Sequence, residues 1–237
     1  MNRAFGILAG ASLWAGGAVA DCRLALVLAL DVSASVDTQD YELQRDGLAG
    51  ALNLPVIRNA ILTGGSGSVA LYVFEWSGRY QQDVVVDWTV LDTDAAIDQA
   101  VALVLGHKRI YKEFPTAVGY ALGFAAGALH DGPRCDRKVI DISGDGTNNE
   151  GFLPGSAYQH FPFEDVSVNG LVIQNKEPDV FAFYQTEVRR GPGSFVEYAD
   201  GFADFEAAMG RKLFREVNGM VLGQADGAAE GLIWSPG

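Results

Sequence analysis

Oxygen-bearing side chains occur at two points of the sequence where an apolar run has just ended. The motif Asp31-x-Ser33-x-Ser35 follows an apolar run that begins at Leu24, and Asp145 follows a second such run. If both runs are parallel strands of one sheet, their carboxyl ends lie at the same edge, where open α/β sheets bind ligands. Carboxylates and hydroxyls form a hard oxygen shell, which suits Mg²⁺, Mn²⁺ or Ca²⁺ and excludes softer metals. The two segments therefore indicate a divalent-cation site.

The same residues have a simpler explanation as a turn followed by a helix cap, because Asp and Ser are common at both. The sequence contains none of the usual motifs of serine hydrolases, zinc proteases, P-loop proteins or dinucleotide-binding proteins. Asp145, Thr147 and Asn149 are spaced as in a calcium-binding loop, but Ser156 stands where that loop requires Glu. A hard-metal site and an ordinary turn are thus the two readings of these residues.

The segments that must position these residues alternate between strand and helix. Apolar runs predict strands at residues 24–30, 69–74, 82–88, 138–143, 168–173 and 194–197. Helical patterns and caps predict helices at residues 37–53, 92–105, 116–129, 178–189 and 202–217. In the first helix we expect Leu43, Leu48 and Leu52 on the inner side. This order predicts a single α/β domain with a mostly parallel sheet, followed by a flexible tail at residues 218–237.

The composition is that of an acidic globular protein. The 237 residues include 17 Lys and Arg against 30 Asp and Glu, which gives a formal net charge of −13, and 49% are hydrophobic. Such a chain repels phosphate backbones, so nucleic-acid binding is not expected. Two cysteines and three histidines are too few for a zinc site built from those residues.

The first twenty residues have the features of an export signal. Arg3 precedes an uncharged stretch rich in Ala, Leu and Gly, and residues 18–20 form a small-x-small cleavage site. We therefore expect residues 1–20 to be removed, and the mature protein to be periplasmic or secreted with no membrane span. A lipid anchor on Cys22 is disfavoured because Asp21 stands where a small residue would be needed.

The sequence resembles the von Willebrand factor type A (VWA) domain over roughly residues 22–217. The resemblance rests on Asp31, Ser33 and Ser35 after an apolar strand, on Thr116 at the opening of a helix, and on Asp145 at the end of a strand. It implies a doubly wound sheet of six strands in the order 3-2-1-4-5-6, with the third strand antiparallel at the edge and helices on both faces.

The resemblance also implies a metal-ion-dependent adhesion site. In such a site Ser33 and Ser35 would ligate the cation directly, Thr116 directly or through water, and Asp31 and Asp145 mainly through water. An acidic group from a protein partner completes the shell. Together with the export signal and the oxygen ligands, the resemblance leads us to expect an exported, non-enzymatic and monomeric binding module, with Mg²⁺ as the favoured cation and Mn²⁺ or Ca²⁺ as alternatives.

One departure from the family concerns the loop before Thr116. VWA domains usually have Gly before this threonine, whereas Phe114 and Pro115 stand here. The role of Thr116 depends on the geometry of this loop. A VWA scaffold with a vacant metal site, which binds partners through its surface, is therefore an alternative.

Two further segments resemble a bacterial subgroup of exported VWA-like proteins. They contain Glu75 and Trp76, after the second predicted strand, and Thr147, Asn148 and Asn149, after Asp145. All five are expected near the edge that carries the metal motif. Glu75 and Trp76 either line the binding face or cap the sheet, and Thr147, Asn148 and Asn149 are candidates for the same face.

An enzymatic alternative comes from the segment at residues 144–149, which also resembles the last motif of haloacid-dehalogenase-type phosphatases. Asp31 would then be the nucleophile. That family requires a second Asp as general acid where Ser33 stands, and a lysine further upstream than Lys138. It also has Asp where this chain has Asn149. These mismatches favour the binding module.

The two cysteines occupy matched positions relative to the two site aspartates. Cys22 lies shortly before Asp31, and Cys135 lies at a similar distance before Asp145. If the first and fourth strands are neighbours, as the resemblance implies, both cysteines lie at the sheet end opposite the metal motif. Neighbouring strands are about 4.8 Å apart, which is within reach of a disulfide. A structural Cys22–Cys135 disulfide is therefore expected, with two unrelated thiols as the alternative.

A few polar residues remain outside this scheme. Asp141 lies inside the predicted strand 138–143, where its burial is costly unless it is paired, and the sequence does not identify the partner. We expect a structural pairing rather than a catalytic role. His107, His130 and His160 are isolated and are expected at the surface or in loops.

Overall fold

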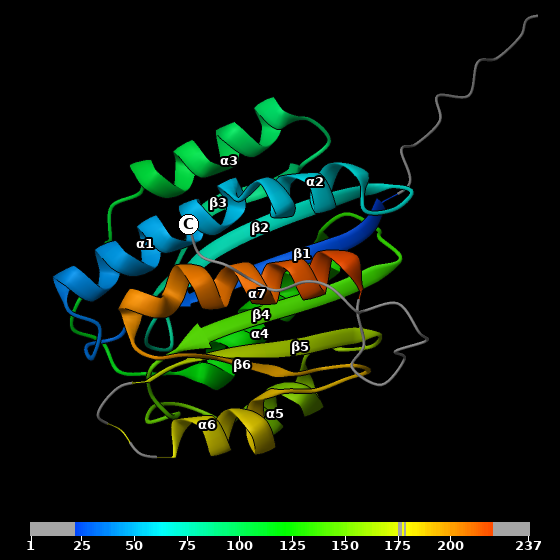
Figure 1. Ribbon diagram of the computed structural model, residues 1–237. Coiled ribbons are helices and arrows are strands. Elements are labelled where there is room, and N and C mark those ends of the chain that lie inside the picture. The colour runs from blue at the N-terminus through cyan, green and yellow to red at the C-terminus, as the bar shows by residue number, and fades with distance from the viewer. Residues whose placement is uncertain (1–21, 175–176, 178, 220–237) are drawn as a thin grey trace, which may run out of the picture.

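Six strands form one sheet in the order β3-β2-β1-β4-β5-β6 (Figure 1). The protein is represented by a computed structural model that describes residues 22–174, 177 and 179–219. The strands are β1 (Cys22–Asp31), β2 (Ser68–Trp76), β3 (Gln82–Val90), β4 (Arg137–Gly144), β5 (Val166–Ile173) and β6 (Val196–Ala199). β3 pairs with β2 in the antiparallel direction, and every other neighbouring pair is parallel. The predicted strand order and the antiparallel edge strand are confirmed.

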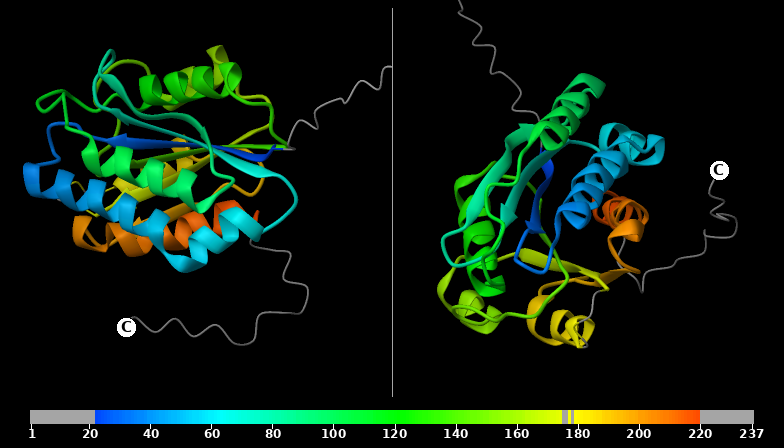
Figure 2. Two further views of the ribbon diagram at one scale, coloured as in Figure 1. Left: turned by 90° about the horizontal axis from the view of Figure 1, so that it is seen from above. Right: turned by 90° about the vertical axis from the view of Figure 1, so that its left-hand side faces the viewer.

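Helices cover both faces of this sheet (Figure 2). They are α1 (Thr38–Asn53), α2 (Pro55–Thr63), α3 (Asp94–Gly106), α4 (Val118–Asp131), α5 (Pro154–His160), α6 (Val180–Phe183) and α7 (Phe205–Asn218), with a π-helical turn at Tyr184–Val188 and a 3-10 turn at Phe202–Asp204. The side chains of β1 alternate between two cores, because successive side chains of a strand point to opposite faces. Leu26 and Leu28 pack with α1, α2 and α7, whereas Val27 and Ala29 pack with α4. Burial on both faces explains why β1 is apolar throughout.

Small residues allow α4 to lie close to its neighbours. A Cβ atom added to Gly123 would lie 2.9 Å from the Phe161 ring, and one added to Gly119 would lie 2.1 Å from the carbonyl oxygen of Phe152. A larger residue at Gly119 would require the backbone at Phe152 to move, and one at Gly123 would require the Phe161 ring to move. The Ala and Gly content of this helix therefore reflects close packing, as expected from its sequence.

Several element boundaries differ from the sequence prediction. α2 and α5 were not predicted; both are short and begin at a proline, which is favoured in the first turn of a helix. Leu43 is 36% exposed rather than inside, because the buried stripe of α1 passes through Tyr41, Gln44 and Leu48. The last strand starts two residues later than predicted, at Val196.

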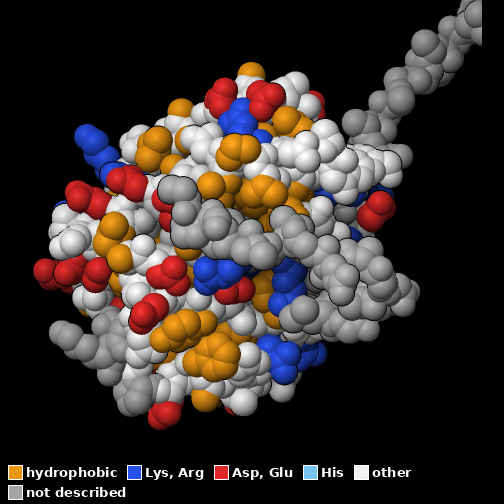
Figure 3. Space-filling model, in the orientation of Figure 1, with side chains coloured by type: hydrophobic (Ala, Val, Ile, Leu, Met, Phe, Trp, Pro, Cys, Tyr) orange, Lys and Arg blue, Asp and Glu red, His pale blue; other side chains and the backbone are white. Residues whose placement is uncertain are grey.

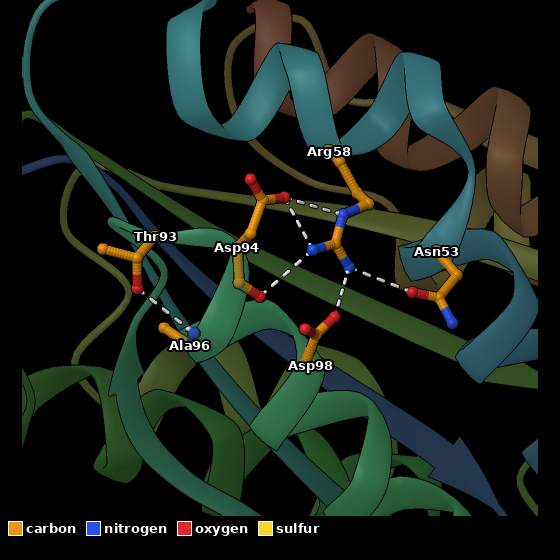
Figure 4. Close-up of polar contacts among 6 residues, drawn as sticks. All are labelled: Asn53, Arg58, Thr93, Asp94, Ala96 and Asp98. Carbon is orange, nitrogen blue, oxygen red and sulfur yellow. Dashed lines mark hydrogen bonds and ion pairs between the residues drawn. The ribbon is translucent and has the colours of Figure 1, made fainter.

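Arg58 joins α2 to the first turn of α3 (Figure 4). Its guanidinium donates hydrogen bonds to Asp94 Oδ1 at 2.6 and 3.0 Å, and to Asp98 Oδ1 at 2.8 Å. Thr93 caps the same helix, because its hydroxyl oxygen accepts from the backbone N–H of Ala96 at 3.2 Å. These contacts fix the start of α3 against α2.

A disulfide links the start of β1 to the segment before β4. Cys22 and Cys135 are bonded with their Cα atoms 4.5 Å apart, so the predicted disulfide is confirmed. Within the described ranges, none of the helices has the length and apolar character needed to cross a bilayer. The predicted signal at residues 1–20 and the tail beyond Gly219 lie outside the described residues.

Candidate metal site

The loop after β1 turns sharply at the carboxyl edge of the sheet. Asp31 Oδ1 accepts a hydrogen bond from the backbone N–H of Ser33 at 2.8 Å. Asp37 then caps α1 by accepting from the N–H of Asp40 at 2.9 Å. Both features belong to the turn-and-cap explanation of this motif. The motif is therefore a capped turn, and its hydroxyls remain available for further contacts.

The five predicted metal-site residues meet in one hydrogen-bonded cluster. Ser33 Oγ lies 3.2 Å from Ser35 Oγ, and Thr116 Oγ1 donates to Ser33 Oγ at 3.2 Å. Ser35 Oγ donates to Asp145 Oδ1 at 2.7 Å. Asp31, Ser33, Thr116 and Asp145 are at most 4% exposed, whereas Ser35 is exposed. The cluster thus places oxygen atoms from three separate loops at one point, with Ser35 on its solvent side.

Asn149 holds Thr116 in this cluster. Its side-chain oxygen accepts from the N–H of Thr116 at 2.8 Å, and its backbone N–H donates to the carbonyl of Thr116 at 2.9 Å. The loop before Thr116 is fixed as well, because the carbonyl of Phe114 accepts from Ala34 N–H at 2.9 Å and Ser77 Oγ donates to the carbonyl of Pro115 at 3.2 Å. The geometry around Thr116 is therefore set by specific contacts despite the missing glycine.

The neighbouring residues of the same loop have different roles. Asn148 caps α4 from outside the helix: its side-chain oxygen accepts from Gly119 N–H at 3.0 Å, and the N-cap residue Ala117 has no side-chain oxygen of its own. Thr147 hydrogen-bonds to the exposed carboxylate of Glu177 through both its hydroxyl and its backbone N–H. These residues therefore support the site loop and its rim.

Buried Gln44 on α1 and half-buried Arg109 in the loop after α3 hold the Asp31–Ser35 loop. Gln44 Nε2 donates to the carbonyl of Asp31 at 2.9 Å. Arg109 donates to the carbonyls of Val32 at 2.8 Å, Ser33 at 3.0 Å and Val36 at 2.8 Å. Sequence reasoning missed both residues. Neither carries a motif, and the contacts of Arg109 join segments more than seventy residues apart.

The electrostatics of the cluster favour a bound cation. Burial, and next the charge of Asp145, raise the pKa of Asp31 to about 8. No described group donates a hydrogen bond to Asp31 Oδ2, which is buried. Gly144 leaves room beside this atom, since a Cβ there would lie 2.9 Å from Asp31 Oδ2 and 2.5 Å from Tyr184 Oη. A cation near Asp31 would offset the cost of burying its charge.

The donor set fits a hard divalent cation. It contains two carboxylates and three hydroxyls, and such oxygen ligands suit Mg²⁺, Mn²⁺ or Ca²⁺. In the described part of the chain, no three His, Cys, Asp or Glu side chains are grouped so that they could hold a metal. Because the cluster itself supplies only two carboxylates, a further negatively charged group from a partner would strengthen cation binding.

Glu75 and Trp76 lie inside the protein rather than on its surface. Trp76 has no exposed surface, and Glu75 is 3% exposed. Glu75 Oε2 lies 3.4 Å from His107 Nε2, and Asp83 Oδ2 lies 3.2 Å from the same atom. Glu75, followed by Asp83, raises the pKa of His107. His107 is thus half-buried between two carboxylates, a pairing that its isolated position in the sequence did not indicate.

A family profile described as "Protein of unknown function (DUF1194)" matches residues 21–221. The chain belongs to this family. No curated protein matches the DUF1194 chain. Its relationships beyond the family come from solved structures.

Those structures have the VWA fold. Proximal thread matrix protein 1 from the mussel byssus is 13% identical with a TM-score of 0.60, and the match covers 82% of this chain and 47% of that one. A von Willebrand factor type A structure from Catenulispora acidiphila is 16% identical with a TM-score of 0.57, covering 83% and 43%. An aerotolerance-related membrane protein from Bacteroides fragilis is 17% identical with a TM-score of 0.52, covering 83% and 100%.

At these identities the comparison shows the fold alone. The chain spans about half of the byssus protein and less than half of the Catenulispora protein. A further structure of the byssus protein is described as having a zinc-occupied MIDAS motif; it is 13% identical with a TM-score of 0.58, covering 84% and 48%. The DUF1194 chain is therefore a VWA-fold protein, as the resemblance implied.

Proposed function

We propose that this protein is an exported, non-enzymatic VWA-type module that binds a divalent cation and, through it, a protein partner. The observation that carries the proposal is the cluster at the carboxyl edge of the sheet, where Asp31, Ser33, Ser35, Thr116 and Asp145 meet. The unpartnered oxygen of Asp31 is a ready position for a cation or for a water bound to it. An acidic group of the partner would complete the shell.

The residues of the cluster take distinct roles in this proposal. Ser33, Ser35 and Thr116 supply neutral oxygen ligands. Asp31 and Asp145 supply the negative charge, mainly through water. Mg²⁺ is the favoured ion, with Mn²⁺ and Ca²⁺ as alternatives. Ser35 is the exposed member, so a partner carboxylate would approach from its side.

Export is supported by the disulfide. Cys22 and Cys135 are bonded, and disulfides persist mainly in oxidising compartments. We propose a signal at residues 1–20, a functional domain at residues 21–217 and a flexible tail at residues 218–237, with the mature protein in the periplasm or secreted as a monomer. Mass measurement of the protein from the envelope fraction would give a chain that begins at Asp21. An uncleaved chain would contradict this part of the proposal.

Thermal unfolding of the full chain with each ion, and with a chelator, tests the metal site. A ligand at a hundred times its Kd stabilises the native state by about 2.7 kcal/mol, so Mg²⁺ is expected to raise Tm. Ser33→Ala should abolish the shift. Asp136→Asn is a suitable control, because Asp136 is exposed beside Cys135 at the opposite end of the sheet. If none of the three ions changes Tm or releases heat in calorimetry, the metal site is vacant and the proposal is wrong.

The enzymatic alternative has its own test. Ser33 occupies the position of the general acid in the phosphatase scheme, and a serine hydroxyl is too weak an acid for that role. We therefore expect no hydrolysis of p-nitrophenyl phosphate with Mg²⁺ present. Hydrolysis that is lost in Asp31→Asn would favour the phosphatase instead.

A further inference from the structure

A basic pocket lies beside the candidate metal site, between the first turns of α1 and the loop after α3. Its volume is about 210 Å³. Tyr41, Glu42 and Arg45 line it from α1, and Lys108, Arg109 and Lys112 line it from the loop. With Thr38 and His107, eight residues line the pocket. Four of them are Lys or Arg and one is acidic, although the chain as a whole has 17 Lys and Arg against 30 Asp and Glu.

The surrounding surface makes this concentration of positive charge distinctive. On the face covered by α1 and α7, acidic side chains gather toward the side where the parallel strands end (Figure 3). A negatively charged ligand would be repelled by most of the protein. The pocket is therefore a local exception at the edge where the metal cluster lies.

Some of the basic groups of the pocket already form hydrogen bonds or ion pairs within the protein, and others do not. Arg109 donates to backbone carbonyls, including that of Ser33, and Arg45 is paired with Asp46 at 2.7 Å. Lys108 and Lys112 are exposed, and neither ammonium group has a hydrogen bond or ion pair with a described residue. The two lysines are thus the groups of the pocket that are free to bind an anion.

The loop also exposes two apolar side chains: Ile110 lies between the two lysines, and Phe114 follows Lys112 and Glu113. Ile110 is 62% exposed and Phe114 is 37% exposed, whereas Arg109 and Tyr111 are partly buried. Charged and apolar side chains are therefore interspersed along the exposed side of the loop, where Glu113 is the acidic member. This pattern fits an acidic polypeptide better than a small inorganic anion, because a polypeptide can present carboxylates and apolar side chains together and an inorganic anion has no apolar group.

The pocket and the metal cluster share a wall. Arg109 lines the pocket and donates to the Ser33 carbonyl at 3.0 Å, and the backbone of Phe114 is bonded to that of Ala34 at 2.9 Å. One extended segment can therefore reach both sites. We infer that this pocket binds a second acidic group of the partner, so that the ligand is an acidic polypeptide segment. This inference rests on the proposed metal-dependent function.

A fluorescein-labelled hexaglutamate peptide is the probe for this inference. Its anisotropy would be measured with the full chain, with and without Mg²⁺. In the double variant Lys108→Glu/Lys112→Glu we expect affinity to fall about tenfold or more, because attraction becomes repulsion. The matched control is Arg134→Glu/Lys138→Glu, which makes the same change in net charge at the opposite end of the sheet. The control should bind as the unmodified protein does.

Each outcome decides one question. If both double variants lose peptide affinity equally, or if neither loses affinity, the proposed pocket is contradicted. Displacement of the peptide by an equal concentration of inorganic phosphate also overturns it in favour of a small-anion site. The effect of Mg²⁺ on Tm judges the metal site separately. If peptide binding needs Lys108 and Lys112 but not Mg²⁺, the pocket is supported and the metal-dependent function is contradicted. If peptide binding needs Mg²⁺ but not the two lysines, the metal-dependent function is supported and the pocket is contradicted.

Discussion

Lys212 Nζ lies 3.1 Å from Asp141 Oδ1, and both side chains are buried between the sheet and α7. Glu216 Oε1 lies 2.6 Å from the same ammonium and also accepts from Asn169 Nδ2 at 2.7 Å. Lys212 is therefore the partner that Asp141 required. Two carboxylates share one ammonium here, and neither belongs to the metal cluster. The arrangement anchors α7 to β4 and β5.

Replacement of Lys212 by Met would leave two buried carboxylates without a cation. Removal of one partner from a buried ion pair costs about 3–5 kcal/mol, so we expect a loss of that size in the free energy of unfolding. Denaturation in urea measures it. Arg211→Met is the control: the neighbouring Arg211 is 46% exposed and pairs with Glu197 at the surface. A loss as small as that of the control would show that α7 does not depend on the buried pair.

The substitution Asp141→Asn should change how the stability of the protein depends on pH. Burial is the largest cause that raises the pKa of Asp141, and the charge of Glu216 adds to it. Between its unfolded pKa of about 4 and the raised folded pKa, the folded state holds the proton more tightly, so stability falls as pH rises. Asn cannot titrate. The stability of the variant relative to the wild type should therefore increase between about pH 4 and pH 8, the unfolded and folded pKa values of Asp141. A difference in stability that stays constant over this range in urea titrations would contradict the raised pKa.

The fold was largely predictable because its signals are local. Apolar runs identified β1, β2, β4 and β5, since a strand buried on both faces reads the same way in any context. α2 and α5 were missed because short helices carry little periodicity. The strand order came from the family resemblance, since periodicity alone does not determine which strands are neighbours.

The candidate site was predictable only in part. The motif residues Asp31, Ser33 and Ser35 are identifiable from their spacing, but the residues that hold them are not. Arg109 and Asn149 act through contacts that exist only in the folded chain. The partners of Asp141 and His107 were missed for the same reason, because each pair joins distant segments of the sequence.

The disulfide should contribute to stability through the unfolded state. Cys22 and Cys135 are separated by 113 residues, and closing a loop of this size stabilises by up to about 4.7 kcal/mol in the chain-entropy model. Cys22→Ser/Cys135→Ser should therefore unfold at lower urea concentration. Because the cysteines lie at the sheet end opposite the cluster, Mg²⁺ should still raise Tm in this variant. An unchanged urea midpoint would show that the bond does not constrain the unfolded chain.

Asn149→Ala should weaken metal binding through Thr116. The substitution removes the side-chain oxygen that accepts from Thr116 N–H, so the threonine hydroxyl is less firmly placed. Supporting residues around a metal ligand typically contribute 10- to 100-fold in affinity, and we expect Kd for Mg²⁺ to rise by about tenfold. Asn148→Ala is the comparison, because it removes a helix cap and should cost about 1 kcal/mol of stability. Equal Mg²⁺ affinities in the two variants would contradict the role given to Asn149.

Arg109→Lys tests whether the guanidinium positions the metal loop. Arg109 donates to the carbonyls of Val32, Ser33 and Val36 at once, a geometry that a single ammonium group cannot reproduce. The substitution keeps the positive charge, so a change in Mg²⁺ affinity would report loop geometry rather than net charge. Calorimetry should show Kd increased by about tenfold. Arg58→Lys, on α2, is the control and should leave Kd unchanged. If Arg109→Lys binds Mg²⁺ as the control does, the loop is held by its own backbone and by Gln44.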